Sequence, residues 1–492
     1  MLRCCRWYLL VGLGLGIAAT GLIFLLAWRN IFDILVTEEK SLLPGTAFYK
    51  EWRRPAVHPT WQLYVFNWTN ADAVLSHPQQ QSSAQFQQLG PFTYDEHSEI
   101  VDAKFHSING TLTYRKRTFF KPYSRNEQSI PTKTLEITSV NFLALIVSHL
   151  ARDKDYAVQR ELSYLLHSFN QGVTITKPIG QLLFTGFREP ILEEIRKVVC
   201  REKDTGMPCQ DDRLAYFRTF NVSRRASDIY SLDIGAQDRS LYGRVLIGGL
   251  GMQRFGKNEH TACDDSERVL TGELFPSRLD LNEPINVVLP ELCRRLTLTF
   301  NREVLVDNIP GYLYTVSFVK QENSEECPIK TTRSGRYGIL NNHECYQLPM
   351  YESEAEIAGA GSGNDYFVIE PTTGTVLESH IGLTYHTHLK PNPHIALFQD
   401  VPEFRVPLFR FTRTYRLNES KALKLKQLLH LMQLGYQVAL AGCVLGAAIV
   451  VLTVLYAGWN GHRGRHARKL NADYSIVGTQ LSSIGRDGHL LK

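Results

Sequence analysis

Two histidines have types and spacing that could support chemistry. His386 and His388 occupy alternate positions in a stretch with strand character, so their side chains would share one face. Two imidazoles on one face could bind a transition metal together with a third ligand. No third ligand can be placed from the sequence, and Ile381, Leu383 and Tyr385 would take the opposite face. We therefore interpret the histidines as the polar, solvated side of an amphipathic strand and expect no metal site.

Sequence signatures of catalysis are missing. The chain has no Gly-x-Ser-x-Gly, His-Glu-x-x-His, phosphate-binding P-loop or Cys-x-x-Cys motif. Its formal net charge of +5 over 492 residues is mild, and it shows neither zinc-finger spacing nor a stripe of basic and aromatic residues. We therefore expect neither an enzyme nor a cofactor, and no binding of nucleic acid.

A basic cluster could receive an anionic ligand. Arg152, Lys154 and Arg160 lie close together in a region with helical periodicity. Guanidinium and ammonium groups bind carboxylates and phosphates, so a fatty acid, an oxidised phospholipid or a lipoprotein could be held here. Three acidic residues are interspersed with them, and the alternative is an ordinary solvated helix face.

Two long uncharged stretches would anchor the rest of the chain. Trp7–Trp28 and Leu434–Ala457 contain no charged side chain, and about 20 apolar residues suffice to cross a bilayer. Arg3 and Arg6 precede the first stretch, and a basic run that begins at His462 follows the second. Because basic flanks favour the cytoplasm, both termini should be cytoplasmic.

The organisation that follows has five parts. One alternative is a cleavable signal peptide, for which Ala18 and Ala19 offer small residues, but the first apolar run continues past those alanines. The other alternative is a core helix of a soluble protein in place of the second span. Gly12–Gly16 and Gly442–Gly446 would let the two membrane helices approach closely. The expected parts are a cytoplasmic N-terminus (1–6), a span (7–28), an extracellular or lumenal ectodomain (29–433), a second span (434–457) and a cytoplasmic tail (458–492).

Glycosylation sequons and cysteines support an ectodomain between the spans. All four Asn-x-Ser/Thr sequons lie there, at Asn67, Asn109, Asn221 and Asn418. Six of the nine cysteines also lie there, and an even number in an oxidising compartment indicates disulfides, although spacing alone leaves the pairing open. Cys4, Cys5 and Cys443 lie in or beside the spans. The six between the spans are Cys200, Cys209, Cys263, Cys293, Cys327 and Cys345.

Strand patterns dominate the region between the spans. Period-two alternation predicts strands, and one region with period 3.6 predicts two helices, Asn141–Leu150 and Tyr156–Phe169, with Gly172 as a stop signal. The predicted strands are Leu63–Phe66, Thr111–Phe120, Leu296–Phe300, Tyr312–Phe318 and Ile381–Leu389.

Several blocks, in this order and at this spacing, resemble the class B scavenger receptors. The family includes a fatty-acid translocase, a high-density-lipoprotein receptor and a lysosomal integral membrane protein. The resemblance covers nearly the whole chain, with departures at Met350–Gly363, at Ile381–His388 and at the single cysteine Cys327. The matching blocks are Val65–Asp72, Leu89–Glu96, Leu182–Pro190, Leu292–Leu296 and Ile369–Gly374.

The resemblance implies an α+β fold. The ectodomain would be an antiparallel β-barrel-like structure with a membrane-distal helical bundle, at about 138–200, and an apolar tunnel. It would be anchored by an N-terminal and a C-terminal transmembrane helix. The family's cysteine placement also suggests the pairs Cys263–Cys327 and Cys293–Cys345, which would leave Cys200–Cys209 as a local loop.

The resemblance also implies the function. The protein would be a receptor that binds fatty acids, phospholipid, cholesterol or lipoproteins and passes lipid to the bilayer through the tunnel. The alternative is an endosomal or lysosomal trafficking receptor that binds a protein cargo on the helical bundle. A membrane-tethered hydrolase is disfavoured, because the motifs for a nucleophile or a metal are missing.

The C-terminal tail carries two short strings typical of membrane-protein sorting. Tyr474 is followed three places later by the apolar Val477, and Asp487 precedes the dileucine Leu490–Leu491. Cys4 and Cys5 stand where S-acylation is plausible. We therefore expect the protein at the plasma membrane, in the endosome–lysosome system, or in both.

Overall fold

The computed structural model describes most of the chain in two compact units. One unit combines Met1–Val36 with Leu423–Lys492, and the other is Thr37–Ala422. We call them the helical unit and the sheet unit. The described residues are 2–76, 83–123, 134–152, 154–199, 213–217, 229–247, 269–289, 294–318, 340–341, 351–353 and 365–484.

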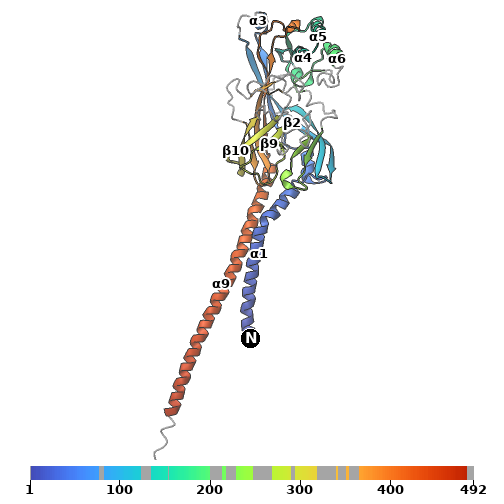
Figure 1. Cartoon of the computed structure of the whole chain (residues 1–492). Coiled ribbons are helices and arrows are strands. Elements are labelled where there is room, and N and C mark those ends of the chain that lie inside the picture. Colours follow the sequence, from blue (N-terminus) through green and yellow to red (C-terminus); the bar gives the residue numbers. More distant parts are fainter. Residues whose placement is uncertain are drawn as a thin grey trace, which may run out of the picture. The chain divides into compact units, whose positions relative to one another are not determined.

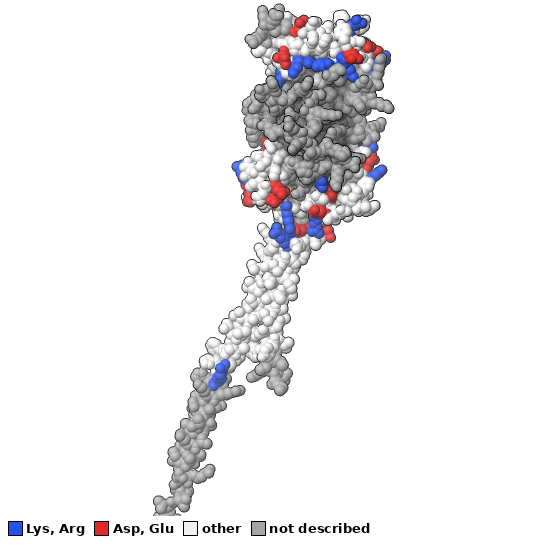
Figure 2. All heavy atoms as spheres, viewed as in Figure 1, with Lys and Arg blue, Asp and Glu red and all other residues white. Residues whose placement is uncertain are grey.

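The helical unit is built from two long apolar helices, α1 (Leu2–Glu39) and α9 (Glu419–Ile484) (Figure 1). Both are long and apolar enough to cross a membrane, over Trp7–Glu39 and Glu419–Arg463. The described surface of the two helices is almost uncharged on the face seen in Figure 2. Each helix continues beyond the apolar stretch that the sequence marks as a span.

Small residues let the backbones of α1 and α9 come close. A Cβ atom added to Gly21 would lie 2.7 Å from the Cys443 nitrogen, and one added to Gly14 would lie 2.9 Å from the Gly446 oxygen. Gly442 also faces α1, as expected. The expectation for the first helix was wrong, because Gly12 and Gly16 face open space. At 3.6 residues per turn, Gly12 lies on roughly the opposite side of α1 from Gly14.

In its described residues the sheet unit forms a 14-stranded sheet in which all neighbouring strands are antiparallel except β8 and β9, which run parallel. Its ends meet. The Thr271 nitrogen, in the last residue of β8, donates to the Gly243 oxygen beside β7 at 3.1 Å, and Arg244 forms an isolated β-bridge with Leu270. The sheet is therefore nearly closed. In spatial order the strands are β7 (Val245–Ile247), β6 (Tyr230–Asp233), β3 (Thr111–Pro122), β2 (Phe86–His106), β1 (Thr60–Trp68), β16 (Phe404–Arg416), β15 (Thr375–Leu389), β14 (Tyr366–Glu370), β11 (Ile309–Phe318), β10 (Arg294–Val306), β9 (Ile285–Leu289) and β8 (Val269–Thr271), with β13 (Tyr351–Ser353) joining β15 to β12 (Leu340–Asn341).

All five predicted strands and both predicted helices are confirmed, with small changes at their ends. The helix α4 begins after Asn141, whose side-chain oxygen accepts from the Ala144 nitrogen at 3.2 Å, as an N-cap should. The helix α5 ends at Ser168, and the residue that turns with positive φ is Asn170 rather than the expected Gly172.

Helices gather at one end of the sheet unit (Figure 1). This helical end contains α4 (Phe142–Ala151), α5 (Tyr156–Ser168), α6 (Ile191–Val199), the π-helical turn η1 (Gln181–Thr185) and the hairpin of β4 (Glu136–Val140) and β5 (Thr174–Pro178). The remaining short elements are α2 (Ala47–Arg53), α3 (Ala71–Ser76), η2 (Arg239–Leu241) and η4 (Ala396–Phe398).

Both chain exits of the sheet unit lie at its other end. There β1 begins at Thr60 opposite Thr414, near the end of β16. The Lys40 ammonium is buried and donates to the main-chain oxygens of Phe275 and Thr373, at 2.8 and 2.5 Å. Burial lowers the pKa of Lys40 to about 7, and the negative charge of Glu370 opposes that shift. The residue that follows α1 is thus fixed to the sheet unit.

Candidate functional site

The inner face of the sheet is lined by large apolar side chains. Alternate residues of a strand point to one face, and β1 contributes Trp61, Leu63 and Val65, each fully buried. Their partners across β16 and β15 follow the same alternation, so Phe411 lies opposite both Leu63 and Leu383. The result is an apolar lining that runs along consecutive strands of the wall.

One ion pair interrupts this lining. Glu96 accepts two hydrogen bonds from the Arg413 guanidinium, at 2.7 Å from Nε to Oε2 and 3.1 Å from Nη2 to Oε1. The Trp61 indole nitrogen donates to the same carboxylate at 2.5 Å. Glu96 is 1% exposed, and a carboxylate so buried requires such partners. Because Trp61 stands directly opposite Arg413 on the neighbouring strand, the sheet register itself builds the group.

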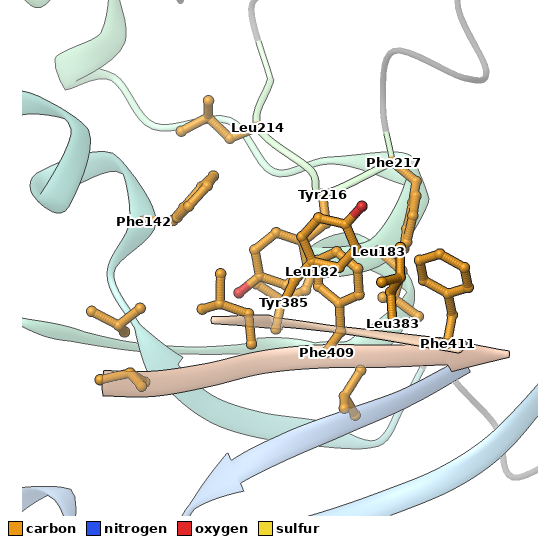
Figure 3. Close-up of a cluster of buried hydrophobic side chains, with 14 of the residues drawn as sticks. Phe142, Leu182, Leu183, Leu214, Tyr216, Phe217, Leu383, Tyr385, Phe409 and Phe411 are labelled. Atoms are coloured by element: carbon orange, nitrogen blue, oxygen red, sulfur yellow. The ribbon is translucent and has the colours of Figure 1, made fainter. Parts of the chain in front are cut away.

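Aromatic rings fill the inside of the sheet. Trp61 stacks on Phe411 with 4.4 Å between ring centroids, and Tyr385 stacks on Phe409 at 4.7 Å. Figure 3 shows the rings of Tyr385, Phe409 and Phe411 grouped with two others, Tyr216 and Phe217. The latter two come from a segment outside the strands, and nothing in the local sequence pattern of that segment predicts its place.

The segment Leu214–Phe217 reaches the aromatic group from the helical end. Its main chain bonds to η1, since the Tyr216 and Phe217 nitrogens donate to the Leu182 and Leu183 oxygens at 2.8 Å each. The Tyr216 hydroxyl lies 3.3 Å from the Ser139 hydroxyl on β4. Burial raises the pKa of Tyr216 to about 12, so this hydroxyl is neutral at physiological pH.

A second set of charged residues meets at the helical end, where Figure 2 shows basic and acidic side chains together. The Arg152 side chain donates to the Pro391 oxygen at 3.1 Å. Glu403 lies 3.5 Å from the His388 imidazole and 3.7 Å from the Lys390 ammonium. Partial burial lowers the pKa of His388, and the positive charges of Lys390, Arg405 and Arg152 add to that effect while Glu403 opposes it.

The structure divides the predicted basic cluster. Arg152 joins His388, Lys390 and Arg405, three residues distant in sequence that the local pattern could not place. Lys154 lies in the turn between α4 and α5, where the Gln159 side chain donates to its main-chain oxygen at 2.9 Å. Arg160 is on the exposed face of α5 and takes no part in the contacts around Glu403 that the described residues make.

The interpretation of His386 as solvated was wrong, because His386 is only 1% exposed. It lies in β15 between two neighbours, with Tyr351 of β13 opposite it on one side and Pro407 of β16 on the other. Burial lowers its pKa to about 4. Among the residues that the structure describes, no group of three or more His, Cys, Asp or Glu side chains could hold a metal ion.

The other predicted site residues lie apart from these groups. Asn109 is exposed in the turn between β2 and β3. Asn418 accepts from the Lys421 nitrogen at 3.0 Å at the start of α9, and Asn67, within β1, accepts from the Thr138 nitrogen at 2.9 Å. Tyr474 and Val477 belong to α9. Outside the described residues lie Asn221, Asp487, Leu490, Leu491 and the six cysteines Cys200, Cys209, Cys263, Cys293, Cys327 and Cys345.

These features define a membrane protein with a folded sheet unit between two candidate terminal spans. The model of the CD36 family matches residues 11–356 and 363–457. The chain is 23% identical over 441 residues to Protein peste of Drosophila melanogaster, covering 85% of this chain and 77% of that protein. It is also 23% identical over 460 residues to sensory neuron membrane protein 1 of Ostrinia furnacalis, covering 84% of each.

The chain therefore belongs to the CD36 family, and the resemblance to class B scavenger receptors is confirmed. It is a scavenger-receptor-like membrane protein, from a family of receptors rather than enzymes. The interruption of the family match, at 357–362, falls within Met350–Gly363, where the sequence departs from the family pattern.

Proposed function

We propose that this protein is a receptor that binds lipids, lipoproteins or lipid-bearing particles and passes lipid to the bilayer through the inside of its sheet unit. The observation that carries the proposal is the apolar lining of a nearly closed sheet. Each methylene moved from water into such a lining contributes about 0.8 kcal/mol, so a long acyl chain would strongly prefer it.

The charged residues at the helical end would receive the polar part of the ligand. Arg152, Lys154 and Arg160 are the residues expected to attract an acidic head group, and Lys390 and Arg405 extend the basic surface around Arg152. An arginine binds a carboxylate or a phosphate with two parallel hydrogen bonds. A fatty acid or a phospholipid on the surface of a lipoprotein offers such a group, whereas cholesterol would enter by its apolar body alone.

The proposal includes the membrane topology and the compartment. Both termini would be cytoplasmic, with the sheet unit outside the cell or in an endosomal or lysosomal lumen. Glycans on Asn67, Asn109, Asn221 and Asn418 and the pairs Cys263–Cys327, Cys293–Cys345 and Cys200–Cys209 belong to this arrangement. The strings ending at Val477 and Leu491 would distribute the protein between the plasma membrane and endolysosomal membranes.

A matched pair of substitutions on β1 tests the interior route. Leu63 points inward and is fully buried, whereas its neighbour Gln62 is exposed. Leu63→Trp should reduce uptake of a fluorescent long-chain fatty acid, and Gln62→Trp should leave it unchanged, at equal amounts of protein on the cell surface. Leu383→Phe adds less bulk to the same face of the sheet, so it tests the route even if Leu63→Trp does not fold. Equal uptake by all three variants and the wild type would refute the route.

A second candidate function has support on α5. Tyr156 and Tyr164 are 67% and 70% exposed, one helical turn on either side of Arg160. Tyrosine and arginine are among the residues enriched where proteins bind one another, so the helical end could instead hold a protein cargo for delivery to lysosomes. Steady-state localisation separates the two functions, since a cargo receptor of this kind should reside mainly in lysosomes and keep full cargo delivery in the Leu63→Trp variant.

A further inference from the structure

Phe217 lies inside the sheet, among aromatic side chains of the sheet wall. Its ring is 4.8 Å from that of Phe409 on β16, 6.0 Å from Trp61 on β1 and 6.1 Å from Phe120 on β3. These strands belong to one continuous part of the wall, in the order β3, β2, β1 and β16. Phe217 is 2% exposed, so an acyl chain moving along the lining at this level would have to displace it.

The main chain that carries Phe217 is attached to the helical end. Beyond the two bonds to η1, Leu214 exchanges a pair of main-chain hydrogen bonds with Phe187, at 3.1 and 3.2 Å. The ring of Phe217 also lies 5.7 Å from that of Phe184, within η1. The ring is therefore held from the helical end and inserted among the side chains of the sheet, so it can withdraw without breaking the hydrogen bonds between strands.

The turn η1 is an unusual support for this segment. Its five residues form a π-helix, Gln181–Thr185, which ends at Gly186 with a positive φ of 72°. Single π-helical turns are rare, and many occur at functional sites. A shift of this turn would carry the Leu182 and Leu183 oxygens with it, and with them the nitrogens of Tyr216 and Phe217.

We propose that Tyr216 and Phe217 form an aromatic gate, in which the Phe217 ring closes the interior route and the Tyr216 hydroxyl, beside Ser139, holds the ring in place. The inference rests on the proposed function. It assigns the rate-limiting barrier of lipid transfer to side chains held by the helical end rather than to the sheet. The ligand that opens the gate would be a long apolar chain. Such a chain can replace the contacts that the ring gives up, as it moves between Trp61 and Phe409.

Shortening the gate residue should speed transfer. Phe217→Ala removes the ring, and the initial rate of transfer of a fluorescent fatty acid into cells should rise about two- to tenfold, the factor that one aromatic contact contributes. Tyr216→Phe keeps the volume and removes only the hydroxyl, so it should raise the rate less. Phe217→Leu serves as a milder truncation if Phe217→Ala does not reach the surface.

A truncation elsewhere in the core supplies the control. Phe398 of η4 is fully buried in the same hydrophobic core but lies outside the gate, so Phe398→Ala should leave the rate unchanged. An unchanged or lower rate in both Phe217 variants, while Leu63→Trp still blocks uptake, would overturn the gate and leave the route standing. If neither the Phe217 variants nor Leu63→Trp change uptake, the interior route itself is wrong.

Discussion

The burial of His386 should make the stability of the sheet unit depend on pH. Its pKa is about 4 in the folded protein and about 6.5 in an unfolded chain. As pH falls below 6.5 the unfolded chain gains a proton that the folded protein does not, so stability falls until pH 4. The two pKa values differ by about 2.5, which amounts to about 3 kcal/mol over the whole window and about 2 kcal/mol at pH 5.

The assay compares the melting temperature of the purified full-length protein at pH 7.5 and pH 5. For a unit of this size, 2 kcal/mol corresponds to a shift of about 2–3 °C. His386→Gln removes the titration, so the difference in Tm between the two pH values should shrink by that amount. Burial also lowers the pKa of His58, His97 and His388, so part of the wild-type difference should remain.

His167→Gln is the matched control, because this histidine is exposed on α5 and its ring is solvated in both states. It should leave the difference in Tm as it is in the wild type. The reasoning would be refuted if His386→Gln and His167→Gln gave the same difference between pH 7.5 and pH 5.

Three further predictions concern other parts of the molecule. Arg413→Met should lower the free energy of unfolding by about 3–5 kcal/mol, because it leaves a buried carboxylate unpaired, and adding Glu96→Gln should recover part of the loss in a thermal unfolding assay. Gly446→Val should separate α1 from α9 and lower the amount of protein at the cell surface, whereas Gly16→Val, which faces open space, should not. Deleting Tyr474–Val477 should shift the protein from endosomes towards the cell surface, as measured by surface biotinylation.

Each of these has an outcome that would count against it. Equal unfolding temperatures for Arg413→Met and the wild type would mean that the ion pair contributes nothing. Equal surface amounts for the two glycine variants would mean that close packing of the helices is not required. An unchanged ratio of surface to endosomal protein after the deletion would mean that Tyr474–Val477 is not a sorting signal.

The strands and helices of the sheet unit could be predicted because their signals are local. Alternation in Thr111–Phe120 or Tyr312–Phe318 depends only on which face of a strand is buried. The same alternation failed for His386, since it shows that two residues share a face but not whether that face is covered in the folded protein. In the structure His386 is only 1% exposed.

The candidate site could be predicted less well, because it is assembled from residues far apart in sequence. Glu96 and Arg413 are separated by 317 residues, and neither has a local pattern that names the other. Phe217 lies in a segment without periodicity, so no sequence rule places it inside the sheet. Arg152 was predicted as a ligand residue, but its neighbour His388 was interpreted only as part of a strand.

The pairing of β1 with β16 also sets the order in which the sheet can close during synthesis. The Thr412 hydroxyl donates to the Gln62 side chain from 350 residues away in sequence, so β1 lacks one of its two neighbours until almost the whole unit has been made. At about 5–20 residues per second, this delay lasts roughly 20–70 s. An unpaired strand edge with Trp61, Leu63 and Val65 beside it is a template for wrong pairing. Until β16, its last neighbour, has been made, β1 can therefore pair wrongly along this edge.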